Sequence, residues 1–475
     1  MTAPAPASVP SALTSQAPVA VIGGGITGLA AAYRLIKAGQ RVRLFEASTR
    51  LGGAIRTELT DGWLIESGPN SFQENSRPIA ELIRELGLEK ERVVTNAAAR
   101  KRFIVRRGRL CPAPLSPPAL LTTPLFSAGS KLRLLGELFH GRRERTVDVS
   151  LADFVQDHFG QEIVDYALNP FVSGVYAGDA RKLSARHAFP KLWECEQKHG
   201  SLLRGQIALA KARRAEGHPK PKIISFRTGL QALVIALALQ LPAGTIELNA
   251  TIESLVPGAP WRIVWSRGGE AHTEAFAHVI LAVPAASLSK LRFGALAERP
   301  LALLDAIEHP PVASLFLGFR RDQVAHPLDG FGALVPAAEK RALLGVLFSS
   351  TLFPERAPAG HVALTVMVGG AVRPDLTQGS LDQITAAVMP DLNVLLGVTG
   401  TPLFRRLQVW PRAIPQYQLG YERFLDAIAA CERAYPGLAI GGQVRDGIAL
   451  PSCLESGLAM ADRVVSQRSH FKSHL

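Results

Sequence analysis

The pattern of apolar and polar positions near the start of the chain predicts a strand, a helix and a second strand in close succession. Residues 19–22 are a short, mostly β-branched apolar run, and residues 29–38 carry apolar side chains at helical spacing. Gly39 follows as a helix C-cap, and residues 42–45 form the next apolar run. This order of elements is that of a βαβ unit.

The same pattern divides the rest of the chain into helical and strand-rich stretches. Helical periodicity at residues 151–158 and 161–168 predicts a mostly helical region over residues 113–220, and prolines between 112 and 124 indicate a linker before it. Further apolar runs predict strands at residues 246–252, 279–284, 314–319, 343–348 and 363–368. No internal repeat is evident.

A glycine-rich turn lies between the first predicted strand and the helix. Gly23, Gly25 and Gly28 have the spacing of a dinucleotide-binding fingerprint, and Glu46 ends the second strand. Gly23 permits a sharp turn, Gly25 lets the backbone approach a pyrophosphate, and Gly28 lets the helix pack closely on the strand. Backbone N–H groups at the helix start would hold the phosphates, and Glu46 would accept hydrogen bonds from ribose hydroxyls. An acid at this position disfavours a 2′-phosphate, so the pattern predicts FAD or NAD rather than NADP.

Length and composition fit an enzyme of two or three domains. The chain has 475 residues, of which 47% are hydrophobic and 42 are glycine. Residues 1–17 are rich in Ala, Pro, Ser and Thr, and we expect a disordered tail without the features of a signal or transit peptide. The four cysteines (Cys111, Cys195, Cys431 and Cys453) are far apart and form no CxxC pair. We therefore expect neither a disulfide framework nor a metal site, and a cytoplasmic location.

The positive charge of the chain is concentrated in three segments. The net charge is +13 and the pI about 9.9, with the excess at residues 101–109, 131–145 and 204–222. The middle segment mixes apolar and cationic positions as an interfacial amphipathic helix would, although a solvated basic surface explains the charge equally well. No apolar run approaches the roughly eighteen residues needed to span a bilayer. Nucleic acid is not expected, because no recognition motif accompanies the charge.

Two motifs after the βαβ unit resemble the flavin amine oxidase superfamily. The first is Arg50-Leu-Gly-Gly-Ala-Ile-Arg-Thr57, a paired-glycine turn, and the second is Glu66-Ser-Gly-Pro-Asn-Ser-Phe72. Ala54 stands where that superfamily usually has arginine, so the amine oxidase pattern is broken. Within the superfamily, this break and the loop that begins at Gly68 resemble the protoporphyrinogen oxidase family.

Further motifs extend this resemblance over roughly residues 18–465. They are Arg102-Phe103, Ser173-Gly-Val-Tyr-Ala-Gly-Asp179, Phe331-Gly-Ala-Leu-Val-Pro336, Thr365-Val-Met-Val-Gly-Gly370, Ile414-Pro-Gln-Tyr-Gln-Leu-Gly420, residues 441–450 and Cys453-Leu-Glu-Ser-Gly457. Each motif is modest, but their order and spacing together are specific.

The resemblance implies FAD as the cofactor and an α/β fold, α+β overall. A Rossmann-like FAD-binding domain would be built from residues 18–95, 223–290 and 421–467, a mixed-sheet substrate domain from 96–112 and 291–420, and a helical, membrane-associating domain from 113–222. The implied cofactor-binding residues are Gly23, Gly24, Gly25, Ile26, Thr27, Gly28, Glu46, Arg50, Gly52, Gly53, Ala54, Gly68, Pro69, Asn70, Ser71, Ile252, Gly442, Gln443, Ile448, Ala449 and Leu450.

The resemblance also implies the reaction, oxidation of protoporphyrinogen IX to protoporphyrin IX in haem biosynthesis, with dioxygen as acceptor and hydrogen peroxide as product. Leu334, Leu347 and Met367 would form walls of the substrate pocket, Gly174 would leave room for the macrocycle, and Arg102 would pair with a propionate. The sequence has no arrangement that demands a nucleophile, which suits hydride removal by a flavin. His187 and His199 receive no role.

Three alternatives stay open on the sequence. The substrate could be coproporphyrinogen III, which carries two propionates in place of the vinyl groups, so that one more cation in the pocket could change the preference. A different flavin oxidoreductase, such as an amine oxidase or a carotenoid desaturase, is disfavoured by Ala54. A non-catalytic flavoprotein that carries porphyrin is disfavoured by the intact glycine motifs. We expect peripheral contact with the cytoplasmic face of a membrane and leave a homodimer open.

Overall fold

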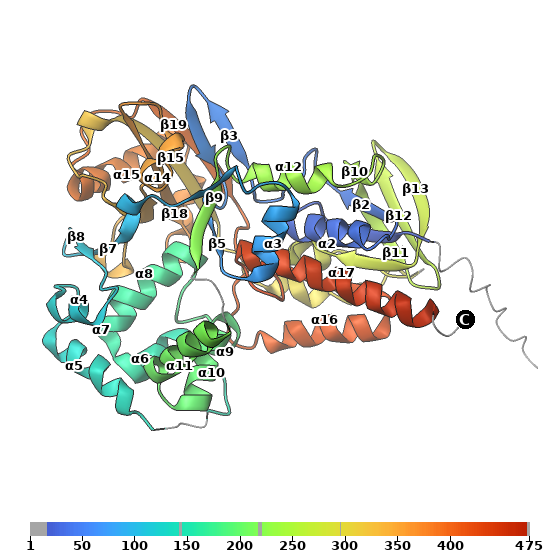
Figure 1. Ribbon diagram of the computed structural model, residues 1–475, viewed down its shortest axis with the longest axis horizontal. Helices are drawn as coiled ribbons and strands as arrows, with labels where there is room; N and C mark the ends of the chain where they lie inside the picture. Colours follow the sequence, from blue (N-terminus) through green and yellow to red (C-terminus); the bar gives the residue numbers. More distant parts are fainter. Residues whose placement is uncertain (1–16, 142–144, 217–220, 295, 473–475) are drawn as a thin grey trace, which may run out of the picture.

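The computed structural model describes residues 17–141, 145–216, 221–294 and 296–472. Figure 1 shows three groups of elements: a parallel sheet with its helices on the right, a larger mixed sheet at the upper left, and a set of helices at the lower left. The expected disordered tail covers residues 1–17, and only residue 17 of it is among the described residues.

The parallel sheet contains the predicted βαβ unit. Its five strands have the order β10-β2-β1-β14-β20, and every neighbouring pair is parallel. They are β1 (Val19–Ile22), β2 (Val42–Glu46), β10 (Ile246–Leu248), β14 (His278–Leu281) and β20 (Leu438–Ile440). Helix α2 (Ile26–Lys37) joins β1 to β2, so the Rossmann-like prediction is confirmed, with a helix that starts three residues early because Gly25 is its N-cap.

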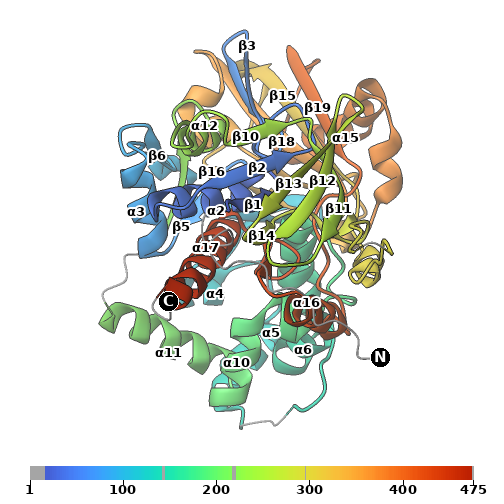
Figure 2. The same ribbon diagram turned by 90° about the vertical axis from the view of Figure 1, so that its right-hand side faces the viewer.

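Helix α2 packs closely against the long C-terminal helix α17 (Leu450–Lys472), as both views show (Figures 1 and 2). At the contact, a Cβ added to Gly457 would lie 2.2 Å from the carbonyl oxygen of Thr27. Fully buried Leu29, Leu44 and Ile280 fill the adjoining core. Because each buried aliphatic side chain contributes about 1.5–3 kcal/mol, this layer holds the glycine turn rigidly at the strand ends.

The strand predicted over residues 246–252 is two strands in different sheets. Asn249 has φ 57°, in the left-handed region, and separates β10 from β11 (Thr251–Val256). Strand β11 pairs instead with β12 (Trp261–Arg267), which pairs with β13 (Glu270–Phe276). The prediction was wrong because asparagine tolerates this backbone conformation, so one polar residue redirects an otherwise continuous run.

The mixed sheet has seven strands in the order β19-β15-β18-β17-β16-β7-β8. Strands were predicted at residues 314–319, 343–348 and 363–368, and they are confirmed as β15 (Val312–Arg320), β17 (Leu343–Leu347) and β18 (His361–Gly369). The others are β7 (Lys101–Arg106), β8 (Arg109–Pro112), β16 (Gly330–Leu334) and β19 (Phe404–Trp410). Helix α15 (Leu381–Leu396) packs its apolar side against one face of this sheet, which leaves the other face for the site.

Smaller elements connect the two sheets. Strands β3 (Thr57–Thr60) and β4 (Trp63–Glu66) form a hairpin, and β5 (Phe72–Glu74), β9 (Lys222–Phe226) and β6 (Arg92–Val94) form a short antiparallel sheet. The helices among them are α3 (Arg77–Glu85), α12 (Gln231–Leu239), α13 (Ala285–Leu288), α14 (Ser349–Leu352) and α16 (Glu422–Ala434), with 3₁₀ turns η1 (Ala97–Arg100), η5 (Ala302–Ala306), η6 (Arg321–Gln323), η7 (Ala337–Glu339), η8 (Pro354–Arg356) and η9 (Pro374–Gln378).

Within its described part, the region over residues 113–220 is helical and contains no strand. Its helices are α4 (Pro117–Thr122), α5 (Ala128–Gly136), α6 (Leu151–Phe159), α7 (Gln161–Ile163), α8 (Asn169–Phe171), α9 (Ala185–Ala188), α10 (Pro190–His199) and α11 (Leu202–Ala215), with the 3₁₀ turn η2 (Glu137–Phe139). The helix predicted over 161–168 changes after Ile163 to π-helix η3 (Val164–Leu168), and a second π-helix is η4 (Val172–Tyr176). Such π segments are frequent at functional sites.

The interfacial helix expected over residues 131–145 is not one continuous helix. Helix α5 ends at Gly136, and Glu137 of η2 is completely buried. A buried carboxylate with partners inside the protein pulls the chain inward at this point, and residues 142–144 lie outside the described residues. Within the described ranges, every helix is too short or too polar to cross a bilayer.

Candidate active site

The glycine turn between β1 and α2 leaves open space at only one of its fingerprint glycines. A Cβ added to Gly23 would lie 2.5 Å from the carbonyl oxygen of Ala282, and one added to Gly28 would lie 1.9 Å from that of Gly23. A Cβ added to Gly25 would meet no protein atom within 4 Å. Packing therefore explains two of the glycines, whereas the space at Gly25, beside the start of α2, fits a pyrophosphate.

The paired-glycine turn lies directly beside this space. The backbone N–H of Gly52 donates to the carbonyl oxygen of Gly24 at 2.8 Å, and a Cβ on Gly53 would lie 3.4 Å from the Cα of Gly25. The Arg50 guanidinium donates to carbonyl oxygens of its own turn, those of Leu51, Gly53 and Ile55, at 3.1, 2.5 and 2.9 Å. Arg50 thus shapes the turn through these carbonyls.

Glu46 is held at the end of β2 by backbone donors. Its Oε2 accepts from the N–H of Gly24 at 2.7 Å, and its Oε1 accepts from that of Ser48 at 2.8 Å. Each oxygen keeps a further lone pair, which fits a ribose hydroxyl. The carbonyl oxygen of Glu46 accepts from the N–H of Ala250 at 2.9 Å, and this contact brings Ile252 of β11 to the same edge.

The Gly-Pro loop at residues 67–71 is seated on the paired-glycine turn. A Cβ on Gly68 would lie 2.0 Å from the carbonyl oxygen of Ala54, so only glycine fits there. The Trp410 indole N–H donates to the carbonyl oxygen of Ser67 at 2.9 Å, and the Asn70 amide donates to that of Gly68 at 3.3 Å. Pro69 and Ser71 continue the loop toward β5.

The C-terminal loop that contains Gly442 and Gln443 closes the same region. A Cβ on Gly442 would lie 3.4 Å from Thr27 Oγ1, which places the loop over the start of α2. The loop runs through Ile448 and Ala449 into α17 at Leu450. The cofactor-binding residues expected from the sequence therefore belong to segments that lie at the first turn of α2, at the end of β2, or on the paired-glycine turn beside them.

Two tyrosines that the sequence analysis did not select hold this loop. The Tyr417 hydroxyl donates to the carbonyl oxygen of Gln443 at 2.5 Å and accepts from the N–H of Gly447 at 2.9 Å. The Tyr421 hydroxyl donates to the carbonyl oxygen of Val444 at 2.8 Å. Tyr417 lies inside a motif noted above, but only the fold shows that its hydroxyl reaches the loop.

The expected wall residues of the substrate pocket share one face of the mixed sheet. Leu334 of β16 pairs with Gly345 of β17, and Gly345 pairs with Met367 of β18. Leu347 is two residues beyond Gly345 and so points to the same side. A Cβ on Gly174 of η4 would lie 2.4 Å from Leu334 Cδ2, so this glycine lets η4 approach the wall.

Arg102 lies at an open cavity next to this wall. Its guanidinium is 5.2 Å from the centre of the Phe331 ring, and the side chain is exposed and makes no ion pair within the described residues. The cavity has a volume of about 520 Å³ and is lined by Thr95, Asn96, Ala97, Ala99, Arg100, Arg102, Leu115, Ile223 and Phe331. Phe331 and Leu347 both pack on the same small apolar cluster, which joins the cavity to the wall.

The buried side chain of Gln416 connects two of the sequence motifs. Its amide nitrogen donates to the carbonyl oxygen of Tyr176 at 2.9 Å, and a Cβ on Gly178 would lie 2.2 Å from its Oε1. These contacts tie residues 173–179 to residues 414–420, so packing gives both motifs a structural role.

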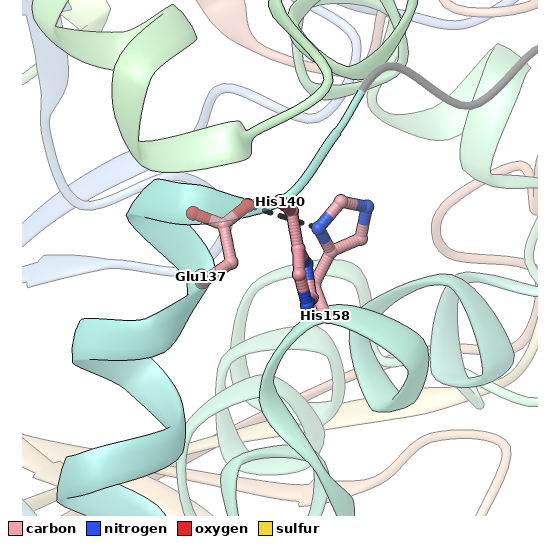
Figure 3. A group of neighbouring side chains, drawn as sticks. All are labelled: Glu137, His140 and His158. Carbon is pink, nitrogen blue, oxygen red and sulfur yellow. Dashed lines mark hydrogen bonds and ion pairs between the residues drawn. The ribbon is translucent and has the colours of Figure 1, made fainter.

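A cluster of buried Glu137 and His158 with partly exposed His140 lies among the helices (Figure 3). His158 Nδ1 is 2.9 Å from Glu137 Oε1, and its Nε2 is 3.0 Å from Oε1 of Glu196. Glu137 also accepts from the Ser201 hydroxyl and from the N–H groups of residues 202 and 203, so all four of its lone pairs are used. This saturation fits a protonated histidine between two carboxylates better than a metal ion.

The stability of the protein should therefore fall with rising pH. Burial lowers the pKa of His158, but hydrogen bonds to Glu137 and Glu196 outweigh burial and raise it above 6.5. The stabilisation is complete below the pKa of about 6.5 in the unfolded chain and is lost as pH rises through the raised folded value. His158→Gln should cost about 3 kcal/mol at pH 6 and flatten the pH dependence of the unfolding free energy above pH 6.5. Exposed His199→Gln is the control; equal slopes for wild type and His158→Gln would contradict the assignment.

The remaining histidine considered above, His187, faces Glu422 at 3.3 Å, at the exposed edge of the helices. Its surroundings contain none of the residues expected to bind cofactor or substrate.

The fold and these motifs define a class of protein. Residues 26–465 match the family model of flavin containing amine oxidoreductases, and the chain belongs to this family. It is an oxidoreductase, and its cofactor is FAD. The space at Gly25 and the free lone pairs of Glu46 suit that cofactor.

Several relatives of the chain are porphyrinogen oxidases. The chain is 33% identical to protoporphyrinogen oxidase 2 of Arabidopsis thaliana over 94% of both chains, and 30% identical to coproporphyrinogen III oxidase of Bacillus subtilis over 93% of this chain and 96% of that one. A crystal structure of a provisionally assigned protoporphyrinogen oxidase from Exiguobacterium sp. 255-15 aligns with a TM-score of 0.80 at 26% identity, covering 95% of this chain and 99% of that one. The resemblance to protoporphyrinogen oxidases drawn from the motifs is confirmed.

Proposed function

We propose that this protein oxidises protoporphyrinogen IX to protoporphyrin IX with dioxygen as the final acceptor. One observation carries the proposal: an apolar wall, a glycine and a free arginine lie together. Leu334 of the wall contacts Gly174, and Arg102 lies at the adjoining cavity. A pocket for a large apolar ring with carboxylate arms needs these features. The relatives named for porphyrinogen substrates support the same conclusion.

In this mechanism the chain binds and orients, and FAD supplies the two-electron acceptor. Arg102 would pair with a propionate, because a guanidinium matches the geometry of a carboxylate. Leu334, Leu347 and Met367 would hold the ring and exclude water from the reacting carbon. Successive two-electron steps would remove hydrogen from the macrocycle, and each pair of electrons would pass to dioxygen to give one hydrogen peroxide.

A second candidate substrate is coproporphyrinogen III. Arg100 lines the same cavity as Arg102, and it is the kind of additional cation that an extra propionate would require. The two substrates differ at the positions of the vinyl groups, so the change in their relative rates in Arg100→Ala measures the contribution of this second arginine.

Anaerobic mixing of the purified flavoprotein with each porphyrinogen tests the proposal. We expect protoporphyrinogen to bleach the flavin absorbance rapidly, and air to restore it with porphyrin fluorescence and peroxide. Faster bleaching by coproporphyrinogen would assign the second substrate instead. Full flavin occupancy without bleaching by either compound, or bleaching by amines alone, would overturn the function.

The helical region would give peripheral contact with the cytoplasmic face of a membrane. Exposed apolar side chains gather on and next to α4 and α5, at Leu115, Leu121, Leu132, Leu135 and Phe139. Basic residues lie among them, and anionic lipid attracts each nearby cation by about 1 kcal/mol. Two of these cations are already engaged, since Lys131 donates to the Leu121 carbonyl and Arg133 to that of Gln156, so the apolar side chains carry this part of the proposal.

A further inference from the structure

A buried ion pair lies between the two sheets. Glu66 is the last residue of β4 and immediately precedes the Gly-Pro loop, and Arg356 is the last residue of η8. Both side chains are almost fully buried, at 2% and 3% exposed, and Glu66 Oε1 is 3.3 Å from Nη2 of Arg356. Neither residue lines the cavity that contains Arg102.

The carboxylate end of this pair contacts the segments around the expected flavin site. The Thr57 hydroxyl donates to Glu66 Oε2 at 2.7 Å, and the N–H of Leu230 donates to Oε1 at 2.8 Å. Thr57 begins β3 directly after the paired-glycine turn, and Leu230 precedes α12. Glu66 therefore joins the Gly-Pro loop, the paired-glycine turn and α12.

The guanidinium end contacts the substrate side. Nη2 of Arg356 donates to the Ser225 hydroxyl of β9 at 2.6 Å, and the guanidinium carbon is 5.3 Å from the centre of the Phe353 ring. Phe353 belongs to the small apolar cluster on which Phe331 and Leu347 pack. Arg356 is thus one side chain away from the cavity and the wall.

We propose that Glu66 and Arg356 form a positioning pair that fixes the flavin-binding loops relative to the substrate wall. The identity of the molecule that the wall binds rests on the proposed function. The placement of the flavin-binding loops does not depend on it. A buried ion pair suits this task because each partner is also held by hydrogen bonds to other segments, and because loss of either partner removes the counter-charge of the other. Neither residue needs to contact the reacting atoms.

The test is a double-mutant cycle with Glu66→Gln and Arg356→Met, read by FAD affinity of the apoprotein, by the flavin reduction potential, and by kcat and KM. Each single variant should weaken FAD binding and lower kcat about 10-fold, with KM changed less than about 3-fold. The double variant should be no worse than the poorer single variant, because it removes both charges. Arg356→Lys should recover part of the lost FAD affinity.

The matched control is the neighbouring exposed pair of Arg227 and Glu355, at 3.7 Å, where Arg227→Met should leave all readouts within about 2-fold. Losses that multiply in the double variant would overturn the pairing. Variants with lower thermal stability but unchanged FAD affinity and reduction potential would overturn the positioning role. The FAD readouts need no substrate, so the pair can be tested even if neither porphyrinogen is oxidised.

Discussion

Replacing Gly25 with valine should produce a folded protein that cannot hold FAD. The backbone of Gly25 has φ −71° and ψ 178°, an extended conformation that valine adopts readily, and an added Cβ meets no protein atom. The valine methyl groups would instead occupy the space expected for the pyrophosphate. Flavin absorbance of the purified variant should be nearly absent, with a loss of about 1 kcal/mol or less in apoprotein stability.

The matched control is Gly28→Val on the same turn. Its Cβ would lie 1.9 Å from a carbonyl oxygen, so we expect a loss of about 3 kcal/mol or more in stability, measured by denaturant unfolding. Comparison of the two variants therefore distinguishes a glycine that leaves space for the ligand from a glycine that is required by packing. Normal FAD occupancy in Gly25→Val would show that the pyrophosphate lies elsewhere.

Replacing Arg102 with alanine should weaken substrate binding with little effect on FAD content. A charge-assisted hydrogen bond contributes about 1.5–3 kcal/mol, so KM for the porphyrinogen should rise about 10- to 100-fold. Arg102 has no ion-pair partner among the described residues, so its removal leaves no carboxylate without a counter-charge there. The fold should therefore tolerate the change.

Two further alanine variants complete this experiment. Arg109 belongs to the same basic segment but does not line the cavity, so Arg109→Ala should leave KM unchanged. Arg100→Ala should raise KM for coproporphyrinogen more than for protoporphyrinogen if Arg100 binds the additional propionate. An unchanged KM in Arg102→Ala would remove the propionate role from that residue.

The local sequence pattern was sufficient to predict those parts of the site in which backbone groups near one turn bind the ligand. The βαβ unit, the spacing of Gly23, Gly25 and Gly28, and the paired-glycine turn all follow from short-range sequence, because turn geometry and helix capping are local. The three central strands β15, β17 and β18 of the mixed sheet were also predictable, since apolar runs bounded by polar residues mark buried strands. Resemblance added the identity of the cofactor, which the comparisons support.

Local pattern failed where one residue changes direction or burial. Asn249 divides an apolar run between two sheets, and buried Glu137 lies at the end of α5, within a segment that was expected to form one continuous helix. Neither change alters the hydrophobic pattern enough to be recognised, because each depends on partners that are distant in the sequence, such as Ser201 for Glu137.

The sequence by itself determined the dinucleotide turn, because this turn depends on backbone geometry set within a few residues. The resemblance of its further motifs to a known family indicated the flavin and the class of enzyme. Only the tertiary structure decided which side chains support them. Glu66 meets Arg356 across 290 positions of sequence, and Tyr417 reaches the loop at Gln443, through contacts that no spacing rule encodes. Buried polar groups must find partners, and the folded chain alone determines which partners are within reach.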